Sequence, residues 1–140
     1  MNTKNIIRPL LLSIIIPFVS KADQKPNILF LFSDDQCFET IGSLGITDIE
    51  TPNLDRLVKS GTTFTRAYNM GSWSGAVCLA SRHMLNTGRF LWRAQEASNK
   101  AEAERAAGRF WSENMKSAGY KTYMTGKWHV RASAEKCFDV

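Results

Sequence analysis

The chain has 140 residues, 44% hydrophobic and 22% charged, and a formal net charge of +5. This length allows one small domain with a modest core, and the composition is that of a globular protein. The first 22 residues hold three basic residues and no acidic one, so that 15 basic residues face 13 acidic ones in the rest. That bias suits an anionic substrate and is too weak for a DNA- or RNA-binding protein.

Residues 1–22 have the pattern of a secretory signal peptide. "MNTKNIIR" is positively charged, "PLLLSIIIPFV" is apolar, and "SKA" ends in a cleavage site after Ala22. The apolar core is about half the ~20 residues that a membrane span needs, and an uncleaved N-terminal anchor is the alternative. We expect residues 23–140 to be exported, to the periplasm or the extracellular space, with no membrane span after cleavage.

Export affects how the three cysteines are interpreted. Cys37, Cys78 and Cys137 are an odd number, so at least one of them stays unpaired in an oxidising compartment. The sequence leaves open whether Cys37 pairs with Cys137. No cluster of cysteine and histidine has the spacing of a zinc site.

The mature chain is predicted to begin with a strand and a helix. The apolar run 27–32, between Pro26 and two aspartates, is typical of a strand buried on both faces of a parallel sheet. A helix is predicted over 51–61, with Thr51 as its N-cap, a proline at its first position, and Gly61 as its stop.

The alternation continues to the C-terminal end. We expect a strand over 62–68, a helix over 78–88, a helix over 109–119 and a strand over 120–130 that enters a glycine turn. Residues 94–108 are rich in alanine and glutamate and fit either a helix or a solvated insertion. This order indicates an α/β fold with a mostly parallel sheet flanked by helices.

Asp34 and Asp35 follow the first predicted strand, where open α/β sheets bind ligands. Two adjacent carboxylates raise one another's pKa, and a hard divalent cation such as Ca²⁺ or Mg²⁺ relieves the repulsion with oxygen ligands. The alternative, which spacing alone favours, is a helix N-cap beside a solvated acid.

Cys78 opens the predicted helix over 78–88. A thiol in that position faces free N–H groups and the positive end of the helix dipole, which favours the thiolate. Arg82 lies one turn further on the same face, so the pair could hold a tetrahedral oxyanion. The spacing does not fit a phosphotyrosine-phosphatase loop, and a buried small hydrophobic side chain is the alternative.

Lys127 and His129 are two residues apart. In an extended segment they share a face, so an ammonium and an imidazole could both face one anion while Trp128 faces the core. An exposed lysine beside a surface histidine is the alternative. The other histidine, His83, follows Arg82 directly and is interpreted as structural.

Four stretches together resemble the N-terminal part of the formylglycine-dependent sulfatases, in the alkaline-phosphatase-like superfamily. They are "KPNILFLFSDDQ", "TPNLDRLVKSGTTFTRAY", "CLASRHMLNTGR" and "AGYKTYMTGKWH", and they occur in the family's order. The family signature is Cys-x-Pro-Ser-Arg followed by Thr-Gly-Arg. The residues in register with it are Cys78, Ser81, Arg82, Thr87, Gly88 and Arg89. Ala80 replaces the usual proline.

This resemblance implies that Cys78 is oxidised to formylglycine, by a formylglycine-generating or an anaerobic maturation enzyme. The hydrated aldehyde would attack the sulfur of a sulfate ester. The resemblance also implies that Asp34 and Asp35 bind Ca²⁺, with Mg²⁺ as a possible substitute, and that this metal contacts the oxygen of the residue derived from Cys78.

The same resemblance implies that charged side chains of the protein bind the sulfuryl group of the substrate. Arg82 would stabilise the gem-diol, and Lys127 and His129 would bind the sulfate oxygens. We expect a sulfuric ester hydrolase that acts on a sulfate ester, such as a sulfated glycan, and not on nucleic acid. The alternatives are a phosphate or phosphonate ester hydrolase of the same superfamily and a non-catalytic exported protein.

The length of the chain departs from this family, whose members are several times longer. The final "CFDV" resembles the Phe-Asp that the family carries just after "GKWH". We therefore expect residues 23–140 to be the N-terminal portion of an alkaline-phosphatase-like catalytic domain, incomplete at its C-terminus. We expect little turnover from the 140-residue chain alone.

The signal-peptide interpretation makes the first testable prediction. Secreted protein should begin at Asp23, because cleavage follows the small-x-Ala pattern that ends at Ala22. N-terminal sequencing of exported material checks this, and an intact Met1 on that material would contradict it.

Overall fold

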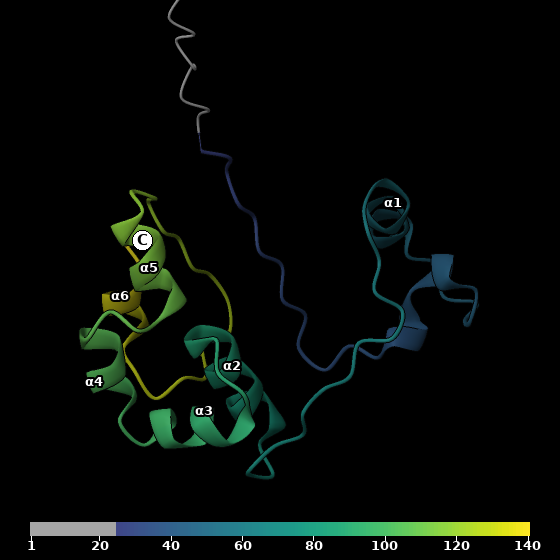
Figure 1. Cartoon of the computed structure of the whole chain (residues 1–140). Coiled ribbons are helices and arrows are strands. Elements are labelled where there is room, and N and C mark those ends of the chain that lie inside the picture. Colours follow the sequence, from purple (N-terminus) through teal and green to yellow (C-terminus); the bar gives the residue numbers. More distant parts are fainter. Residues whose placement is uncertain (1–24) are drawn as a thin grey trace, which may run out of the picture. The chain divides into compact units, whose positions relative to one another are not determined.

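The structure is a computed structural model in which residues 25–140 are described. The predicted signal peptide, residues 1–22, lies outside the described residues. The chain divides into two units, residues 1–32 and 33–140, which are described separately. In the first unit, residues 25–32 run as an extended segment (Figure 1), and the side chains of these residues are exposed.

The sheet that the sequence predicts is not confirmed, because no strand is formed in residues 25–140. The apolar run 27–32 is extended but joins no ladder, and Ile28 and Leu29 are 60% and 82% exposed. Residues 62–68 likewise form turns and irregular backbone. A β-strand is stable only when neighbouring strands take up its backbone hydrogen bonds, so a correct hydrophobic pattern does not make a strand by itself.

Two short 3₁₀ helices and α1 open the second unit. The 3₁₀ helices are η1 (Phe38–Thr40) and η2 (Gly42–Leu44), and α1 is Pro52–Ser60. The prediction for α1 is confirmed: Thr51 is its N-cap residue, a proline starts it and Gly61 is its C-cap residue.

Thr51 binds neighbouring groups instead of capping its own helix. Its Oγ1 accepts the N–H of Gly42 at 2.8 Å and donates to Asp55 at 2.8 Å, while Asp55 accepts the N–H of Ser43 at 2.9 Å. These bonds, that of Thr51 first, lower the pKa of Asp55. A Cβ on Gly42 would lie 2.7 Å from the carbonyl oxygen of Ile49, so the close approach of η2 requires glycine there.

Five helices follow in the remainder of the chain (Figure 1). They are α2 (Val77–Thr87), α3 (Leu91–Ser98), α4 (Ala101–Ala106), α5 (Trp111–Ser117) and α6 (Ala134–Cys137). The prediction that α2 ends at Gly88 is confirmed, and Gly88 is left-handed with φ 63°. Residues 94–108, for which helix and insertion were both open, contribute to α3 and α4. Within the described residues, no helix is both long and apolar enough to cross a membrane.

The core of the second unit lies between α4, α5 and the C-terminal segment. Its members are Ala101, Phe110, Val130, Cys137 and Phe138. The Phe138 ring is at the centre, with edge contacts to Trp111 at 5.7 Å and to Trp128 at 5.6 Å between ring centroids. Because Trp128 and Val130 both pack here, the segment that carries Lys127 is fixed to the core.

The start of the predicted strand over 120–130 makes β-like contacts without forming a strand. The N–H of Val140 donates to the carbonyl of Thr122 at 3.2 Å, and the N–H of Met124 donates to the carbonyl of Val140 at 3.0 Å. Two such bonds on either side of one residue are the pattern of parallel pairing. Asp139 supports the contact by accepting the N–H and the hydroxyl of Thr122, at 2.7 and 3.0 Å.

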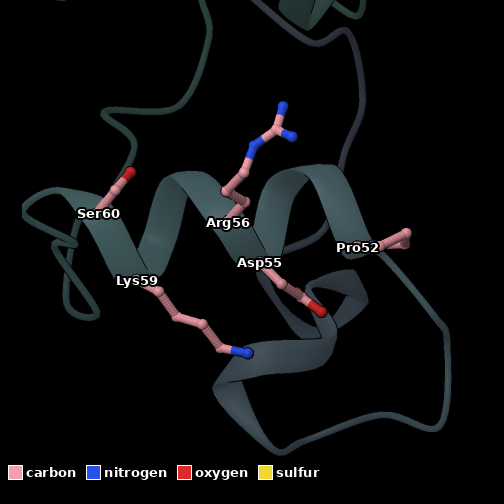
Figure 2. Close-up of a pocket in the computed structure, with 5 residues that line it drawn as sticks. All are labelled: Pro52, Asp55, Arg56, Lys59 and Ser60. Carbon is pink, nitrogen blue, oxygen red and sulfur yellow. The ribbon is translucent and has the colours of Figure 1, made fainter.

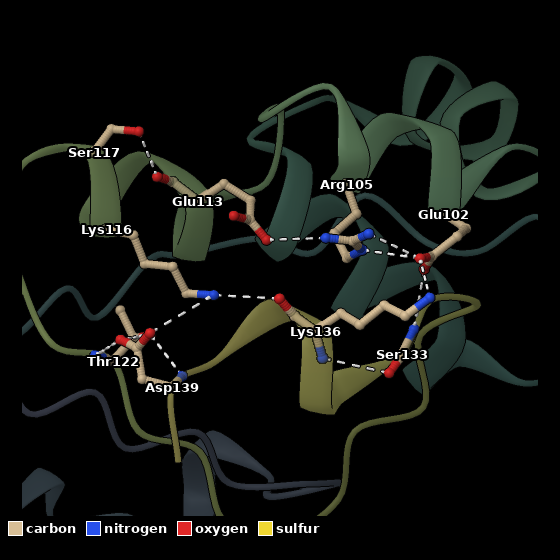
Figure 3. A network of polar contacts seen from close by, with 9 residues as sticks. All are labelled: Glu102, Arg105, Glu113, Lys116, Ser117, Thr122, Ser133, Lys136 and Asp139. Atoms are coloured by element: carbon tan, nitrogen blue, oxygen red, sulfur yellow. Dashed lines mark hydrogen bonds and ion pairs between the residues drawn. The ribbon is translucent and has the colours of Figure 1, made fainter.

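Charged side chains join α4, α5 and α6 (Figure 3). Arg105 lies between Glu102, at 2.9 Å, and Glu113, at 3.6 Å. Glu102 also accepts from Lys136 at 3.3 Å and from the N–H of Ser133 at 3.3 Å. The hydrogen bond from Arg105, first among these, lowers the pKa of Glu102 to about 2.

A second cluster of ion pairs surrounds Glu104, a buried carboxylate on α4. The Glu104 side chain is 3% exposed and lies 2.8 Å from Arg89, beyond the end of α2, and 3.7 Å from Lys100. Arg109 donates two hydrogen bonds to it, at 2.6 and 3.0 Å. The bond from Arg109, followed by that from Arg89, lowers the pKa of Glu104 to about 2.

Glu104→Gln should therefore destabilise the chain by about 2 kcal/mol. Breaking a buried charge pair costs more than that, but Arg109 is half exposed and regains water, which reduces the loss. Urea unfolding at pH 7 measures the change. Glu96→Gln, at an exposed position of α3, is the matched control, and equal midpoints for the two variants would contradict the prediction.

Candidate active site

The N-terminal turn of α2 presents Cys78. The helix begins at Val77, one residue before the predicted start, so Cys78 is its second residue, and its side chain is partly exposed. All three cysteines are free, with Cys37 exposed and Cys137 buried. Burial, first among the causes, raises the pKa of Cys137 to about 11, so this thiol is inert at neutral pH.

Lys127 brings the candidate residues together. Its Nζ donates to Oδ2 of Asp34 and lies 3.4 Å from Sγ of Cys78. A nitrogen of Arg82, Nη2, is 3.9 Å from the same oxygen of Asp34. Residues separated by up to 93 positions in the sequence thus meet at one place, and three of them carry a full charge.

The charges at this place stabilise one another. The hydrogen bond from Lys127, first among several causes, lowers the pKa of Asp34, and the positive charges of Lys127, Arg82 and His129 act in the same direction. The hydrogen bond with Asp34, followed by that with Cys78, raises the pKa of Lys127. At neutral pH the site therefore presents an ammonium and a guanidinium around one carboxylate.

Arg82 reaches the site from the buried side of α2. The residue is 8% exposed, and its Nη1 donates to the backbone carbonyl of Lys127. The side chain of Asn86 donates to the carbonyl of Arg82 at 2.8 Å, within the same helix. Arg82 thus holds the backbone at Lys127 while it faces Asp34.

The segment 127–131, which we call the 127–131 loop, is not extended throughout. His129 is left-handed with φ 47°, so the expectation of a straight segment is wrong at this residue. The chain bends because Trp128 packs against the core and donates its Nε1–H to the carbonyl of Ala132 at 2.6 Å. The expected position of Trp128 toward the core is confirmed, and His129 remains exposed and close enough to lower the pKa of Asp34.

His83 lies next to Arg82 on α2 and is fully buried. Its Nε2 accepts the backbone N–H of Arg131 at 3.2 Å. Burial, more than the nearby charges of Arg131 and His129, lowers the pKa of His83 to about 4. The imidazole is therefore neutral at physiological pH. The sequence indicates a structural histidine here but not the group that it holds.

The described residues supply only part of a divalent metal site. Asp35 is left-handed with φ 61° and exposed, while Asp34 is bonded to Lys127. In residues 25–140 no group of three acidic, histidine or cysteine side chains is placed to hold a metal ion. Two carboxylates offer at most four of the six to eight oxygen ligands that Ca²⁺ takes. The donor chemistry suits a hard cation, but the donor set is too small.

A shallow pocket lies elsewhere, along α1 (Figure 2). It has a volume of about 450 Å³ and is lined by Pro52, Asp55, Arg56, Lys59 and Ser60. None of the predicted site residues lines it, and Asp55 is already bonded to Thr51 and Ser43. The pocket therefore lies apart from the predicted site residues, on the surface of α1.

Comparison with known proteins adds independent information. Residues 26–139 match the family model described as Sulfatase. The chain is 35% identical over 111 residues to an N-acetylgalactosamine-6-O-sulfatase of Bacteroides thetaiotaomicron, covering 76% of this chain and 21% of that protein. It is 33% identical to an ulvan-active sulfatase of Formosa agariphila, covering 80% and 22%.

A mammalian relative gives the same result. Bovine arylsulfatase A is 34% identical over 122 residues, which cover 84% of this chain and 23% of that protein. The chain therefore spans about a fifth of the length of the curated relatives that it matches. No solved structure matches the chain.

The contact between Lys127 and Cys78 makes a prediction about thiol reactivity. Lys127→Met should slow the alkylation of Cys78 by iodoacetamide roughly two- to fivefold at pH 7, because the variant loses the ammonium that lies 3.4 Å from Sγ and attracts negative charge on the reacting sulfur. Peptide mass spectrometry measures the rate, with exposed Cys37 as an internal reference. Lys59→Met, on α1, is the control, and an unchanged rate at Cys78 in Lys127→Met would contradict the prediction.

Proposed function

This chain belongs to the sulfatase family, and we propose that it carries part of the active site of an enzyme that hydrolyses sulfate esters. The observation that supports this most directly is the meeting of Asp34, Cys78, Arg82 and Lys127 at the N-terminus of α2. A nucleophile beside fixed cations is the arrangement that stabilises an anionic transition state.

Cys78 is the proposed source of the nucleophile. We propose that a maturation enzyme oxidises it to formylglycine, whose hydrated form attacks the sulfur of the ester. Partial exposure in the first turn of α2 leaves the side chain accessible to substrate. Ala80, in the position of the usual proline, is fully buried two residues further along the same helix.

Arg82, Lys127 and His129 are the proposed ligands of the sulfuryl oxygens. A lysine ammonium has three N–H donors. Lys127 uses one for Asp34 and one for Cys78, so the third remains for a sulfate oxygen. Arg82 is always charged, and its burial increases the effect of that charge. Charge that spreads over the sulfuryl group would thus meet cations that are already in place.

Asp34 and Asp35 are the proposed carboxylate ligands of a divalent cation, Ca²⁺ or Mg²⁺. When bound, such a cation supplies Lewis-acid charge next to the nucleophile. Further oxygen ligands are needed to complete its shell, since two carboxylates are too few. In the structure, the ammonium of Lys127 balances the charge of Asp34.

The substrate class and the fold follow the family. A sulfated glycan is the proposed substrate, because relatives carry names such as N-acetylgalactosamine-6-O-sulfatase and ulvan-active sulfatase. We also propose the α/β architecture with a mostly parallel sheet, which the parallel pairing of Thr122 and Met124 with Val140 supports. Export through the predicted signal peptide would give the enzyme access to extracellular glycans.

Two measurements test the proposal. In protein produced together with a maturation enzyme, mass spectrometry should find an aldehyde in place of the thiol at Cys78. In a protein that joins this chain to the remainder of a sulfatase catalytic domain, Cys78→Ala should abolish sulfate-ester hydrolysis. Arg82→Ala should reduce it by a factor of about a hundred to a thousand, as for the loss of one oxyanion donor.

The control and the alternatives are decided in the same assay. Cys37→Ala should leave activity unchanged, because the exposed Cys37 lies outside the site. Hydrolysis of an aryl phosphate that exceeds hydrolysis of the matching aryl sulfate would favour the phosphate-ester alternative. Sulfate-ester turnover that survives Cys78→Ala would overturn the proposed nucleophile.

A further inference from the structure

We propose that His83 is a positioning residue, which holds the 127–131 loop in the shape that keeps Lys127 beside Cys78 and Asp34. Its relevance to catalysis rests on the proposed function, whereas the hold on the loop is a property of the fold alone.

Two adjacent residues of α2 bind the loop at its two ends. Arg82 donates to the carbonyl of Lys127, and Nε2 of His83 accepts the N–H of Arg131 at 3.2 Å. Successive helical residues point about 100° apart, so the two contacts reach the loop at separate places. Val130 packs in the core at the far end of the loop, and the His83 contact adds a fixed position for the backbone of Arg131.

Burying the imidazole of His83 costs folding free energy that an apolar side chain of similar size would not cost. His83 is fully buried, and no described residue accepts a hydrogen bond from its Nδ1. Because Nε2 is the acceptor, the hydrogen of the neutral ring is on Nδ1, where it is a buried donor without a partner. What the imidazole adds over a ring of similar size is therefore the acceptor for Arg131.

The bend between the two contacts needs such a hold. His129 lies between Lys127 and Arg131, and it is a non-glycine residue in the left-handed region. That conformation is strained and persists only when the surrounding structure fixes it. Trp128 and Val130 fix the inner side of the loop in the core, and the contacts from α2 fix its backbone.

Loss of the His83 contact would act on Lys127 through the backbone. With the Arg131 amide released, the bend at His129 loses one of its supports, and the backbone of Lys127 varies more in position although Arg82 still binds its carbonyl. The ammonium then spends less time beside Cys78, so the effect should be seen at a thiol that His83 does not contact.

Two replacements separate the acceptor from the volume of the ring. His83→Phe fills the space without an acceptor, and His83→Gln offers a side-chain oxygen to Arg131. In His83→Phe we expect hydrogen exchange at the Arg131 amide to become about tenfold faster or more. We also expect alkylation of Cys78 to slow toward the rate of Lys127→Met. His83→Gln should recover at least half of each effect.

Ser98→Ala is the matched control. Ser98 is buried on α3 and donates only to the carbonyl of Gln95 in its own helix, at 2.8 Å, so its loss affects stability without affecting the loop. Wild-type exchange at Arg131 and wild-type alkylation at Cys78 in His83→Phe would overturn the proposal. So would equal changes in Ser98→Ala.

A measurement on the unaltered protein keeps the proposal falsifiable if His83→Phe does not fold. The N–H···N bond should give a scalar coupling between the Arg131 amide nitrogen and Nε2 of His83 in NMR spectra, and a protonated Nδ1. Absence of the coupling would overturn the proposal. These readouts do not use catalysis, so the hold on the loop is judged separately from the proposed function, which fails if no aldehyde forms at Cys78 or if sulfate-ester turnover survives Cys78→Ala.

Discussion

The rest of the site depends on the contacts that the ammonium group of Lys127 makes with Asp34 and Cys78. This group joins a carboxylate from the start of the second unit to a thiol at the beginning of α2, and nothing else described links Asp34 with Cys78 directly. One positive charge thereby lowers the pKa of Asp34 and contacts both the carboxylate and the thiol. Because the side chain is half exposed, this contact is weak by itself and relies on a backbone that is held elsewhere.

That backbone is held by the more densely packed half of the chain. Phe110, Cys137 and Phe138 are buried, and the carboxylates of Glu102 and Glu104 join helices through arginine and lysine. The segments before α2 differ, since large apolar side chains such as Phe64 and Tyr68 are more than 80% exposed there. The site thus lies where a rigid framework meets a part of the chain whose apolar side chains are still uncovered.

Local signals in the sequence were sufficient for the helices and insufficient for the sheet. Gly61 and Gly88 end α1 and α2 as predicted, because a helix satisfies its own hydrogen bonds within a few residues. The run 27–32 was predicted as a strand, but pairing depends on segments that its own pattern does not specify. The converging residues could be named from their spacing and family resemblance. Two features of the site could not be predicted from the sequence. The contact of His83 with Arg131 joins residues 48 positions apart, and the bend at His129 depends on how Trp128 packs against the core.

The hydrogen bonds of Thr122 and Met124 with Val140, which have the parallel pattern, place a second constraint on the 127–131 loop. Parallel neighbours must be joined by a crossover of about a dozen residues or more, and the connection between Met124 and Val140 is close to that minimum. The loop that carries Lys127 and His129 is therefore the first part of this connection, and it follows directly after the paired segment. Its length is constrained from two sides, so a residue inserted between Met124 and Ser133 would disturb both the hydrogen bonds of Thr122 and Met124 with Val140 and the position of the ammonium.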